Sequence, residues 1–580
     1  MTQPHLFFEF ADQNGNKQPM WFTEPHFIIK ADSLEEVASA FTQVEEALEK
    51  GFYIAGCVSY EAAPAFDSAF NVNQKGEWPL VWFGVFTKPQ YEGVTSSSHS
   101  YSLTPWELGT TYEEYQEGIE QIKAAIERGD TYQVNYTARL QAAFSGDTFS
   151  FYKQLVSNQQ SSYSAYMSLG NEQYILSASP ELFFRKNGSN LVTRPMKGTA
   201  RRGRTLAEDE NYKKALSLSD KDQAENLMIV DLLRNDVGRL ALPGTVKVPE
   251  LFAIETYPTV HQMTSTVEAQ LPENTPMYEI FRSLFPCGSI TGAPKVRTME
   301  YIASLEKTPR DVYCGAIGYM TPNEEAVFNV PIRTVLLNQG QAVYGTGGGI
   351  TWDSTTNGEY EELQTKAKLL TEARPAFKLL ETMQLKDGAY PLLKRHIERI
   401  DQSAHYFNFS FDKEAVVAML EQNALNHPQG LHRVRMLSDQ QGQVKIETIA
   451  VTPTPKEAYG ALAHSPIDPN DPFLFHKTTH RRVYDKHQHE ADGESYAVLL
   501  WNDEGELTEF TIANLVVKER GEYLTPPISS GLLGGTLRGE LVEQGRVKER
   551  VLYKSDLASF EEIWMVNGLR GWIKVQMGSN

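Results

Sequence analysis

The chain has 580 residues, which predicts more than one domain, and its formal net charge at pH 7 is −20. This acidic balance argues against nucleic acid or an anionic membrane surface as the main partner. The three cysteines, Cys57, Cys287 and Cys314, show no CxxC spacing, so neither a disulfide framework nor a zinc site is indicated. The first ten residues lack the pattern of a signal peptide, and no apolar run approaches the length of a membrane span. We therefore expect a cytoplasmic protein.

The first 130 residues carry structural signals only. Residues 1 to about 105 alternate apolar and polar positions, with one predicted helix over 33–50. A second helical pattern covers 111–128 and stops at Gly129-Asp130. The strand-like TYQVNYTARLQ follows, and most of its residues are expected to belong to a core strand.

A hairpin is predicted around Asn187-Gly188, since Asn-Gly separates two apolar, β-branched and aromatic runs. Folding the chain there brings Glu181 close to Arg194, so Glu181 and Lys197 share one end of the hairpin. A carboxylate beside an amine can act as acid or base next to a nucleophile. Because a free lysine has a pKa of about 10.4, that role requires burial or neighbouring positive charge. The alternative is an exposed lysine in a basic turn.

Two helical patterns lie between residues 206 and 242. The second has Glu225 near its N-terminal end, where a carboxylate suits the helix dipole, and this alone could explain the glutamate. Its expected apolar stripe is Leu227, Val230, Leu233, Val237 and Leu240. The polar residues expected to fix the helix through salt bridges and hydrogen bonds are Asp231, Arg234, Asn235 and Asp236.

A glycine-rich segment, YGTGGGITWDS, precedes another predicted helix in the region 355–373. Thr356 and Glu359 have the spacing of a capping box, so Glu359 is either a helix cap or a functional carboxylate. Glu362 lies three residues further on the same helical face and has no capping role. Glycines 347 to 349 would let backbone N–H groups approach a carboxylate closely, although a triple glycine alone is a weak signal.

Four motifs spread over residues 129–368 resemble the chorismate-utilising enzymes, the family of anthranilate, isochorismate and aminodeoxychorismate synthases. They are GDTYQVNYT, RPMKGTARRG, AENLMIVDLLRND and the series CGSITGAPK, GAIGY and GTGGGI. Most of that family has alanine where this chain has Lys197. Lysine there is the mark of the aminodeoxychorismate synthase branch, which leads to p-aminobenzoate and folate.

The resemblance implies a role for each site residue. Lys197 would attack chorismate at C2 as the C4 hydroxyl leaves, and ammonia would then add at C4, with Glu181 as acid or base. His261 would lie near the departing hydroxyl. The implied Mg²⁺ ligands are Glu225 and Glu362, with Glu359 beside them, which suits the preference of magnesium for carboxylates and substrate oxygens. The implied substrate-binding residues are Tyr313, Arg333, Gly347, Gly348 and Gly349.

A second pattern begins at Phe377. The motifs RHIERIDQSA, HKTTHRRVYD, ELTEFTIANL, GLLGGTLRGEL and VNGLRG resemble the fold-type IV pyridoxal-phosphate (PLP) enzymes, which include D-amino-acid aminotransferases and aminodeoxychorismate lyase. Lys477 matches the lysine that holds the cofactor, and Glu509 the partner of the pyridinium nitrogen. The implied phosphate site consists of Arg399 and the backbone at Gly535, Thr536 and Leu537. This chain reads GTLR where the family usually reads GITR, so the threonine hydroxyl is displaced by one position.

The sequence thus predicts an α+β fold in two domains. Residues 1–372 should form a large chorismate-binding β-sandwich with surrounding helices, and residues 377–580 a two-subdomain PLP domain resembling D-amino-acid aminotransferase. The predicted activity is conversion of chorismate and ammonia to aminodeoxychorismate, followed by pyruvate release to give p-aminobenzoate. The alternatives are an anthranilate synthase-like enzyme fused to a class IV aminotransferase, or a non-catalytic chorismate-binding scaffold. No cysteine lies in a glutaminase-type turn, so a separate glutamine amidotransferase is the expected ammonia source, and a homodimer through the PLP domain is a further hypothesis.

Overall fold

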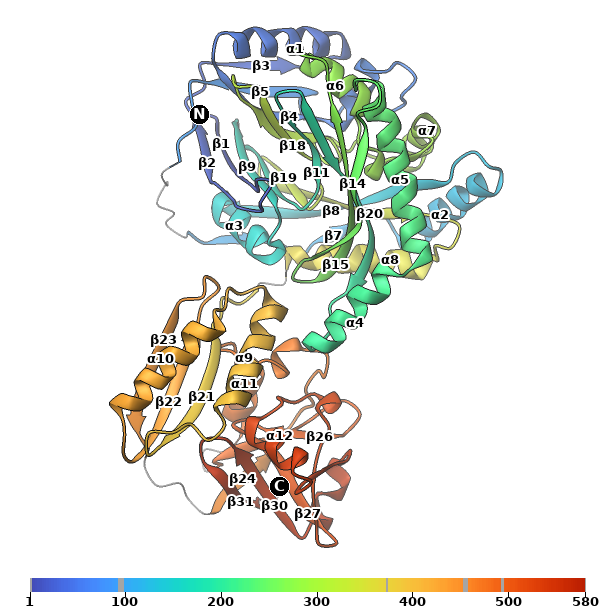
Figure 1. The fold of residues 1–580 in the computed structure, drawn as a ribbon. Coiled ribbons are helices and arrows are strands. Elements are labelled where there is room, and N and C mark those ends of the chain that lie inside the picture. Colours follow the sequence, from blue (N-terminus) through green and yellow to red (C-terminus); the bar gives the residue numbers. More distant parts are fainter. Residues whose placement is uncertain (1–2, 92–98, 372–373, 452–456, 492–494, 579–580) are drawn as a thin grey trace. The chain divides into compact units, whose positions relative to one another are not determined.

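The computed structural model describes residues 3–91, 99–371, 374–451, 457–491 and 495–578. These residues form two compact units, drawn in Figure 1. The first consists of Met1–Arg201 and Lys213–Arg374, and the second of Arg202–Tyr212 and Pro375–Asn580. Among the helices in these ranges, none combines the length and apolar character needed to cross a bilayer.

The first unit contains two ten-stranded sheets. One has the order β16-β8-β20-β19-β10-β9-β1-β2, with β6 and β7 also pairing with β8. Its strands are β1 (His5–Phe10), β2 (Met20–Thr23), β6 (Tyr101–Leu103), β7 (Glu107–Leu108), β8 (Gln133–Gly146), β9 (Tyr163–Gly170), β10 (Gln173–Ser179), β16 (Gly292–Ala293), β19 (Thr334–Asn338) and β20 (Gln341–Ile350). Strand β8 is buried over most of its length, as expected of a core strand.

The second sheet has the order β13-β15-β12-β11-β18-β17-β4-β5-β3, with β14 paired to β15. Its strands are β3 (Phe27–Ala31), β4 (Tyr53–Val58), β5 (Val81–Phe86), β11 (Leu182–Asn187), β12 (Asn190–Arg194), β13 (Met196–Arg201), β14 (Lys247–Thr256), β15 (Val260–Gln270), β17 (Ala316–Met320) and β18 (Glu325–Asn329). The predicted hairpin is present as β11 and β12. Leu182 pairs with Arg194, and Gly188 and Ser189 connect the strands.

The two sheets pack face to face, since one apolar cluster contains Leu6 and Met167 from the first sheet and Cys57 and Val327 from the second. This is the predicted sandwich. The helices of residues 1–374 are α1 (Leu34–Glu49), α2 (Tyr112–Glu127), α3 (Thr148–Gln159), α4 (Leu206–Ser217), α5 (Asp220–Gly238), α6 (Met277–Leu284), α7 (Lys295–Leu305) and α8 (Thr356–Ala367). Helices α1, α5 and α6 cover the outer face of the second sheet (Figure 1).

The structure corrects two helix details. Thr355, not Thr356, caps α8 by accepting a hydrogen bond from the Gly358 N–H, so the predicted capping box is wrong. Glu359 instead accepts a hydrogen bond from the Ser354 hydroxyl at 2.6 Å. On α5, Leu227 is 43% exposed and does not belong to the buried stripe.

The second unit has two sheets. The smaller one is β21 (Leu379–Lys386), β22 (Leu431–Ser438) and β23 (Val444–Ala450), and helices α9 (Leu393–Phe407) and α10 (Lys413–Asn426) pack on one of its faces. The larger has the order β26-β25-β24-β31-β30-β27-β28-β29. Its strands are β24 (Glu457–Leu462), β25 (Ala497–Trp501), β26 (Leu507–Phe510), β27 (Ala513–Glu519), β28 (Glu522–Thr525), β29 (Lys548–Glu549), β30 (Glu562–Asn567) and β31 (Gly571–Met577).

An additional β26–β27 pairing closes the larger sheet into a barrel. Helices α11 (Arg482–Glu490) and α12 (Thr536–Glu543) belong to this part of the unit. The second unit therefore divides into two subdomains, as the sequence predicts.

Candidate functional site

A cavity of about 290 Å³ in the first unit gathers most of the site residues predicted there. Strand β13 supplies Lys197, β20 supplies the glycines, and helices α5 and α8 supply the carboxylates. The predicted residues that line it are Glu181, Lys197, Glu225, Tyr313, Arg333, Gly347, Gly348, Gly349, Glu359 and Glu362. They come from segments more than 180 residues apart in sequence.

Lys197 and Glu181 have the electrostatics of a nucleophile and a proton carrier. Burial lowers the pKa of Lys197, while the charges of Glu225 and Glu181 partly restore it. Glu181 is 3% exposed and accepts a hydrogen bond from the Ser289 hydroxyl. Burial raises the pKa of Glu181 to about 7, against the opposing effects of Ser289 and Lys197. Glu181 can therefore exchange protons near neutral pH, and burial increases the neutral fraction of the Lys197 amine.

Three predicted glutamates face the same cavity, whose lining also includes Asp222. Burial raises the pKa of Glu225 and of Glu359. Burial also opposes ionisation of Glu362, but Lys366, whose Nζ lies 2.6 Å from its Oε1, keeps the pKa of Glu362 below its ordinary value. Oxygen donors of this kind suit Mg²⁺. Within the described ranges, however, no three acidic, His or Cys side chains converge closely enough to form a ready-made metal cluster.

The glycines of β20 leave room for other side chains. A Cβ on Gly349 would lie 1.9 Å from Gln133 Nε2 and 2.8 Å from Lys197 Nζ. A Cβ on Gly348 would lie 3.1 Å from Glu359 Oε2. Glycine at 349 therefore leaves the space that Gln133 and Lys197 occupy, whereas a Cβ at 348 would require Glu359 to shift by a few tenths of an ångström.

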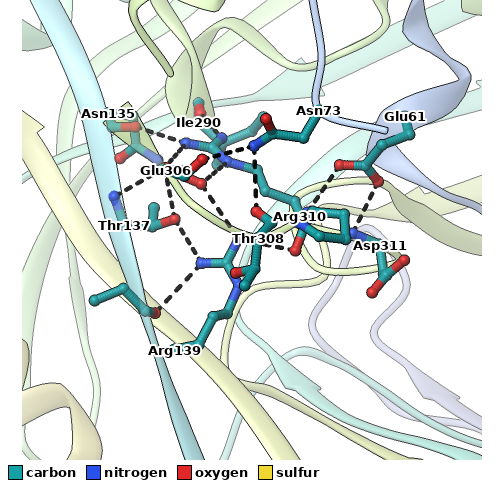
Figure 2. A network of polar contacts seen from close by, with 12 residues as sticks. Glu61, Asn73, Asn135, Thr137, Arg139, Ile290, Glu306, Thr308, Arg310 and Asp311 are labelled. Atoms are coloured by element: carbon teal, nitrogen blue, oxygen red, sulfur yellow. Dashed lines mark hydrogen bonds and ion pairs between the residues drawn. The ribbon is translucent and has the colours of Figure 1, made fainter. Parts of the chain in front are cut away.

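A buried ion network lies under one wall of this cavity (Figure 2). The Glu306 carboxylate accepts hydrogen bonds from Arg310 at 2.6 and 3.0 Å, from Arg139 at 3.2 Å, and from the Thr137 N–H at 3.0 Å. Although burial opposes its ionisation, the charges of Arg310 and Arg139 lower the pKa of Glu306. The guanidinium of Arg139 also lies 5.1 Å from the centre of the Tyr313 ring. The network thus packs against the Tyr313 ring through Arg139.

The same network fixes two other wall segments. Arg310 donates to the Asn135 carbonyl at 2.7 Å and to the Ile290 carbonyl at 2.8 Å. Asn135 and Ile290 both line the cavity. One buried cluster therefore holds strand β8, the 288–290 turn and the segment around Tyr313 in register.

His261 is placed differently from the other predicted residues. It lies on β15, is fully buried, and its Nδ1 is 3.1 Å from the Thr256 hydroxyl. It is not among the described residues that line the cavity. Among the cavity residues that were not predicted, Lys366 and Gln133 carry polar groups close to the predicted site. Lys366 had a detectable signal, its i, i+4 spacing from Glu362, whereas Gln133 had none beyond its place in a core strand.

The second unit contains a cavity of about 370 Å³ lined by Lys477, Arg399, Glu509, Gly535 and Thr536. Burial lowers the pKa of Lys477 to about 8, assisted by the nearby charge of Arg399. The Lys477 carbonyl accepts a 2.9 Å hydrogen bond from the Leu380 N–H, which ties this segment to β21.

Glu509 and Arg399 are held in fixed orientations. The buried Glu509 carboxylate accepts hydrogen bonds from the Tyr484 hydroxyl at 2.8 Å, the Leu533 N–H at 3.0 Å and Asn514 at 3.0 Å. Burial raises its pKa to about 7. Arg399 makes a bidentate pair with Glu381 at 2.8 and 2.6 Å, and with this partner the pKa of the buried Glu381 falls to about 2.

Helix α12 begins at Thr536, with Gly535 as its N-cap. A Cβ on Gly535 would lie 1.8 Å from Asn514 Oδ1, so glycine is required there. The Thr536 hydroxyl lies 3.4 Å from His396 Nε2. Leu537 packs in an apolar cluster and is not among the described lining residues of this cavity. The free N–H groups at the helix start and the nearby Arg399 fit an anionic phosphate.

Comparison with known proteins also finds two separate regions in the chain. Residues 91–372 match the family model described as chorismate binding enzyme, and residues 378–577 the one described as amino-transferase class IV. The chain is 44% identical over 257 residues to aminodeoxychorismate synthase component 1 of Salmonella typhimurium, which is 44% of this chain and 56% of that protein. It is also 44% identical over 268 residues to the Escherichia coli K12 protein of the same name, which is 46% of this chain and 59% of that protein.

The chain therefore spans less than two thirds of the curated relatives it matches. Among solved structures, anthranilate synthase component I from Streptococcus pneumoniae has a TM-score of 0.53 and 22% identity, covering 64% of this chain and 92% of its own, which shows a shared fold. The predicted fold class is confirmed. The chain joins a domain of the chorismate-binding enzyme family to a domain of the class IV aminotransferase family.

Proposed function

We propose that the first unit converts chorismate and ammonia to 4-amino-4-deoxychorismate and water, and that the second converts this intermediate to p-aminobenzoate and pyruvate. The observation that carries the proposal is the placement of Lys197 in one cavity with Glu181 and the glutamates Glu225, Glu359 and Glu362. The name of the curated relatives supports the first step. We propose residues 1–372 and 377–580 as the two catalytic domains.

In the first step, the Lys197 amine is the nucleophile at ring carbon C2, and the C4 hydroxyl leaves. Burial favours this because it increases the neutral fraction of the amine. The Glu181 carboxyl, with a pKa of about 7, can give a proton to the departing hydroxyl and take one from the attacking amine. Ammonia adds at C4 and the lysine departs. His261 is proposed near the leaving hydroxyl on resemblance alone.

Magnesium is the proposed ion of this site, held by Glu225 and Glu362, with Glu359 beside them. Bound there, it would neutralise a carboxylate of the substrate. The described carboxylates do not converge into a complete cluster, which suits an ion that takes its remaining oxygens from substrate and water. Arg333 and Tyr313 are proposed to bind the pyruvyl carboxylate. The backbone of Gly347 to Gly349 is proposed to bind close to the substrate.

In the second unit, the class IV family implies PLP, which supplies an electron sink when bound. Lys477 would hold it and move the C4 proton of the substrate. Glu509 would face the pyridinium nitrogen, and Arg399 with the α12 start, from Gly535 to Leu537, would hold the phosphate. Arg399 is already oriented by Glu381. The aromaticity of p-aminobenzoate drives pyruvate loss.

Ammonia is proposed to come from a separate glutamine amidotransferase subunit, since the relatives are named component 1 of their enzyme. The three cysteines are buried, and burial raises their pKa, so none is a ready nucleophile. A homodimer through the PLP domain is a separate proposal, which light scattering tests.

The test is product analysis of the purified chain with chorismate, ammonium chloride, Mg²⁺ and PLP. We expect p-aminobenzoate and pyruvate in equal amounts. Anthranilate as the product would favour the fusion of an anthranilate synthase to an aminotransferase, and no chorismate consumption would favour a scaffold. Lys197→Ala should block the first step but still convert added aminodeoxychorismate. Lys477→Ala should accumulate that intermediate, and loss of both steps in either variant would contradict the assignment.

A further inference from the structure

The cavity of the second unit is strongly basic. Its lining contains one carboxylate, Glu509, against Lys477 and four arginines, which are Arg399, Arg433, Arg481 and Arg570. The proposed roles account for Lys477, Glu509 and Arg399. The other three arginines have no assigned function.

Two of these three are held by the protein itself. Arg481 donates to the Thr511 carbonyl at 2.6 Å. Arg570 donates to the hydroxyl of Tyr496. Their hydrogen bonds fix them in the wall of the cavity.

Arg433 is different, because within the described residues its guanidinium makes no hydrogen bond or ion pair, and its Nε is buried without a partner. A buried donor left without an acceptor is destabilising, so the site favours a ligand that accepts a hydrogen bond from it. The planar guanidinium fork matches a carboxylate in a bidentate geometry.

The strand pattern explains why Arg433 faces the cavity. Its neighbour Val434 belongs to the apolar cluster packed under α9 and α10, and side chains alternate along a strand. Arg433 therefore projects from the opposite face of the small sheet. On β21, Gln384 pairs with Arg433, while Thr382, two residues away on the same face, lines the same cavity.

The register also separates Arg433 from the reacting lysine. The Leu380 N–H bonds the Lys477 carbonyl, so the start of β21 lies beside Lys477. Gln384, the partner of Arg433, is four residues further, or roughly 13 Å along the strand at about 3.3 Å per residue. Lys477 and Arg433 thus reach into the cavity from opposite ends.

We propose that Arg433 binds the ring carboxylate of the substrate, which lies para to the reacting amine. This rests on the proposed lyase function of the second unit. With the amine at Lys477, the para carboxylate points toward the far end of the cavity, where Arg433 is the unpartnered cation. Arg433 thereby selects carboxylate-bearing rings and orients them for proton removal at C4.

The test uses the full chain loaded with PLP and compares Arg433→Gln with Arg435→Gln. Arg435 lies on the same strand and face but is half-exposed, lies 4.0 Å from Glu447, and does not belong to the cavity lining. We expect Arg433→Gln to raise the KM for aminodeoxychorismate about 10- to 100-fold with kcat nearly unchanged, the effect of losing a charged hydrogen bond. Arg433→Lys should recover part of the loss, and Arg435→Gln should behave as wild type.

A binding measurement separates this role from a structural one. By calorimetry, wild type should bind p-aminobenzoate more tightly than the uncharged p-aminobenzamide, and Arg433→Gln should bind both equally weakly while its PLP affinity is unchanged. An unchanged KM, or a retained preference for the carboxylate in Arg433→Gln, would overturn the proposal. If wild type itself releases no pyruvate from aminodeoxychorismate, the proposed function fails instead.

Discussion

Replacing Glu306 by glutamine should strongly destabilise the first unit. Its two carboxylate oxygens accept five hydrogen bonds, from Thr137, Arg139 and Arg310, and its side chain is 2% exposed. Whichever way the glutamine amide is turned, its NH₂ group faces N–H donors, and both guanidinium groups lose their buried anion. Removing one member of a buried ion pair costs about 3–5 kcal/mol. At about 2 °C per kcal/mol for a large domain, the melting temperature should fall by about 6–10 °C.

Differential scanning calorimetry on the full chain measures this, with the melting of the second unit followed separately by cofactor absorbance. Asp231→Asn is the matched control, because the Arg234–Asp231 pair in the same unit is more than half exposed and should contribute less than about 1 kcal/mol. Only the transition of the first unit should move in Glu306→Gln. A shift in melting temperature as small as that of Asp231→Asn would refute the argument that the network in Figure 2 stabilises the cavity wall.

Three other outcomes are expected. Glu225→Gln or Glu362→Gln should abolish chorismate consumption, since each removes a charged ligand of the proposed magnesium ion, while added aminodeoxychorismate is still cleaved; equal loss in both assays would indicate misfolding instead. Gly349→Ala should slow chorismate turnover about tenfold or more, because its Cβ would lie 2.8 Å from Lys197 Nζ, and near-normal turnover would contradict that spacing. PLP attachment to the cofactor-free chain should accelerate as pH rises through 8 and level off only above it, because only the neutral amine of Lys477, with a pKa of about 8, reacts; a rate independent of pH would disprove this.

Local signals in the sequence predicted local structure well. The Asn187-Gly188 hairpin is present, and helices α1 and α2 lie within the predicted ranges, each with a capping box. The incorrect predictions concern features that depend on tertiary packing rather than on local sequence. Thr355 rather than Thr356 caps α8, and Leu227 is exposed on a helix whose next turns are buried. Periodicity identifies an apolar face but not which of its turns the rest of the fold covers.

The candidate site was only partly predictable for a related reason. Lysines and carboxylates with characteristic flanking residues stand out in a sequence, and the structure gathers Lys197, Glu181 and the acidic residues of α5 and α8 into one cavity. Gln133 and the unpartnered Arg433 do not stand out, and Lys366 is marked only by its i, i+4 spacing from Glu362. Their significance depends on which distant strand or helix they face, and a single sequence carries no information on that contact.

The two lysines show how one residue type can serve two chemistries. Both are desolvated, which lowers the pKa of each. Around Lys197 the strongest charged neighbours are Glu225 and Glu181, which oppose the fall in its pKa and are the proposed metal ligand and proton carrier. Around Lys477 the strongest charged neighbour is Arg399, which deepens the fall and offers a site for a phosphate anion. A lysine that must attack and then leave benefits from carboxylates that can exchange protons with it, whereas one that must hold an anionic cofactor benefits from a neutral amine among fixed cations. The charges that surround each lysine, more than the lysine itself, therefore separate the two proposed reactions.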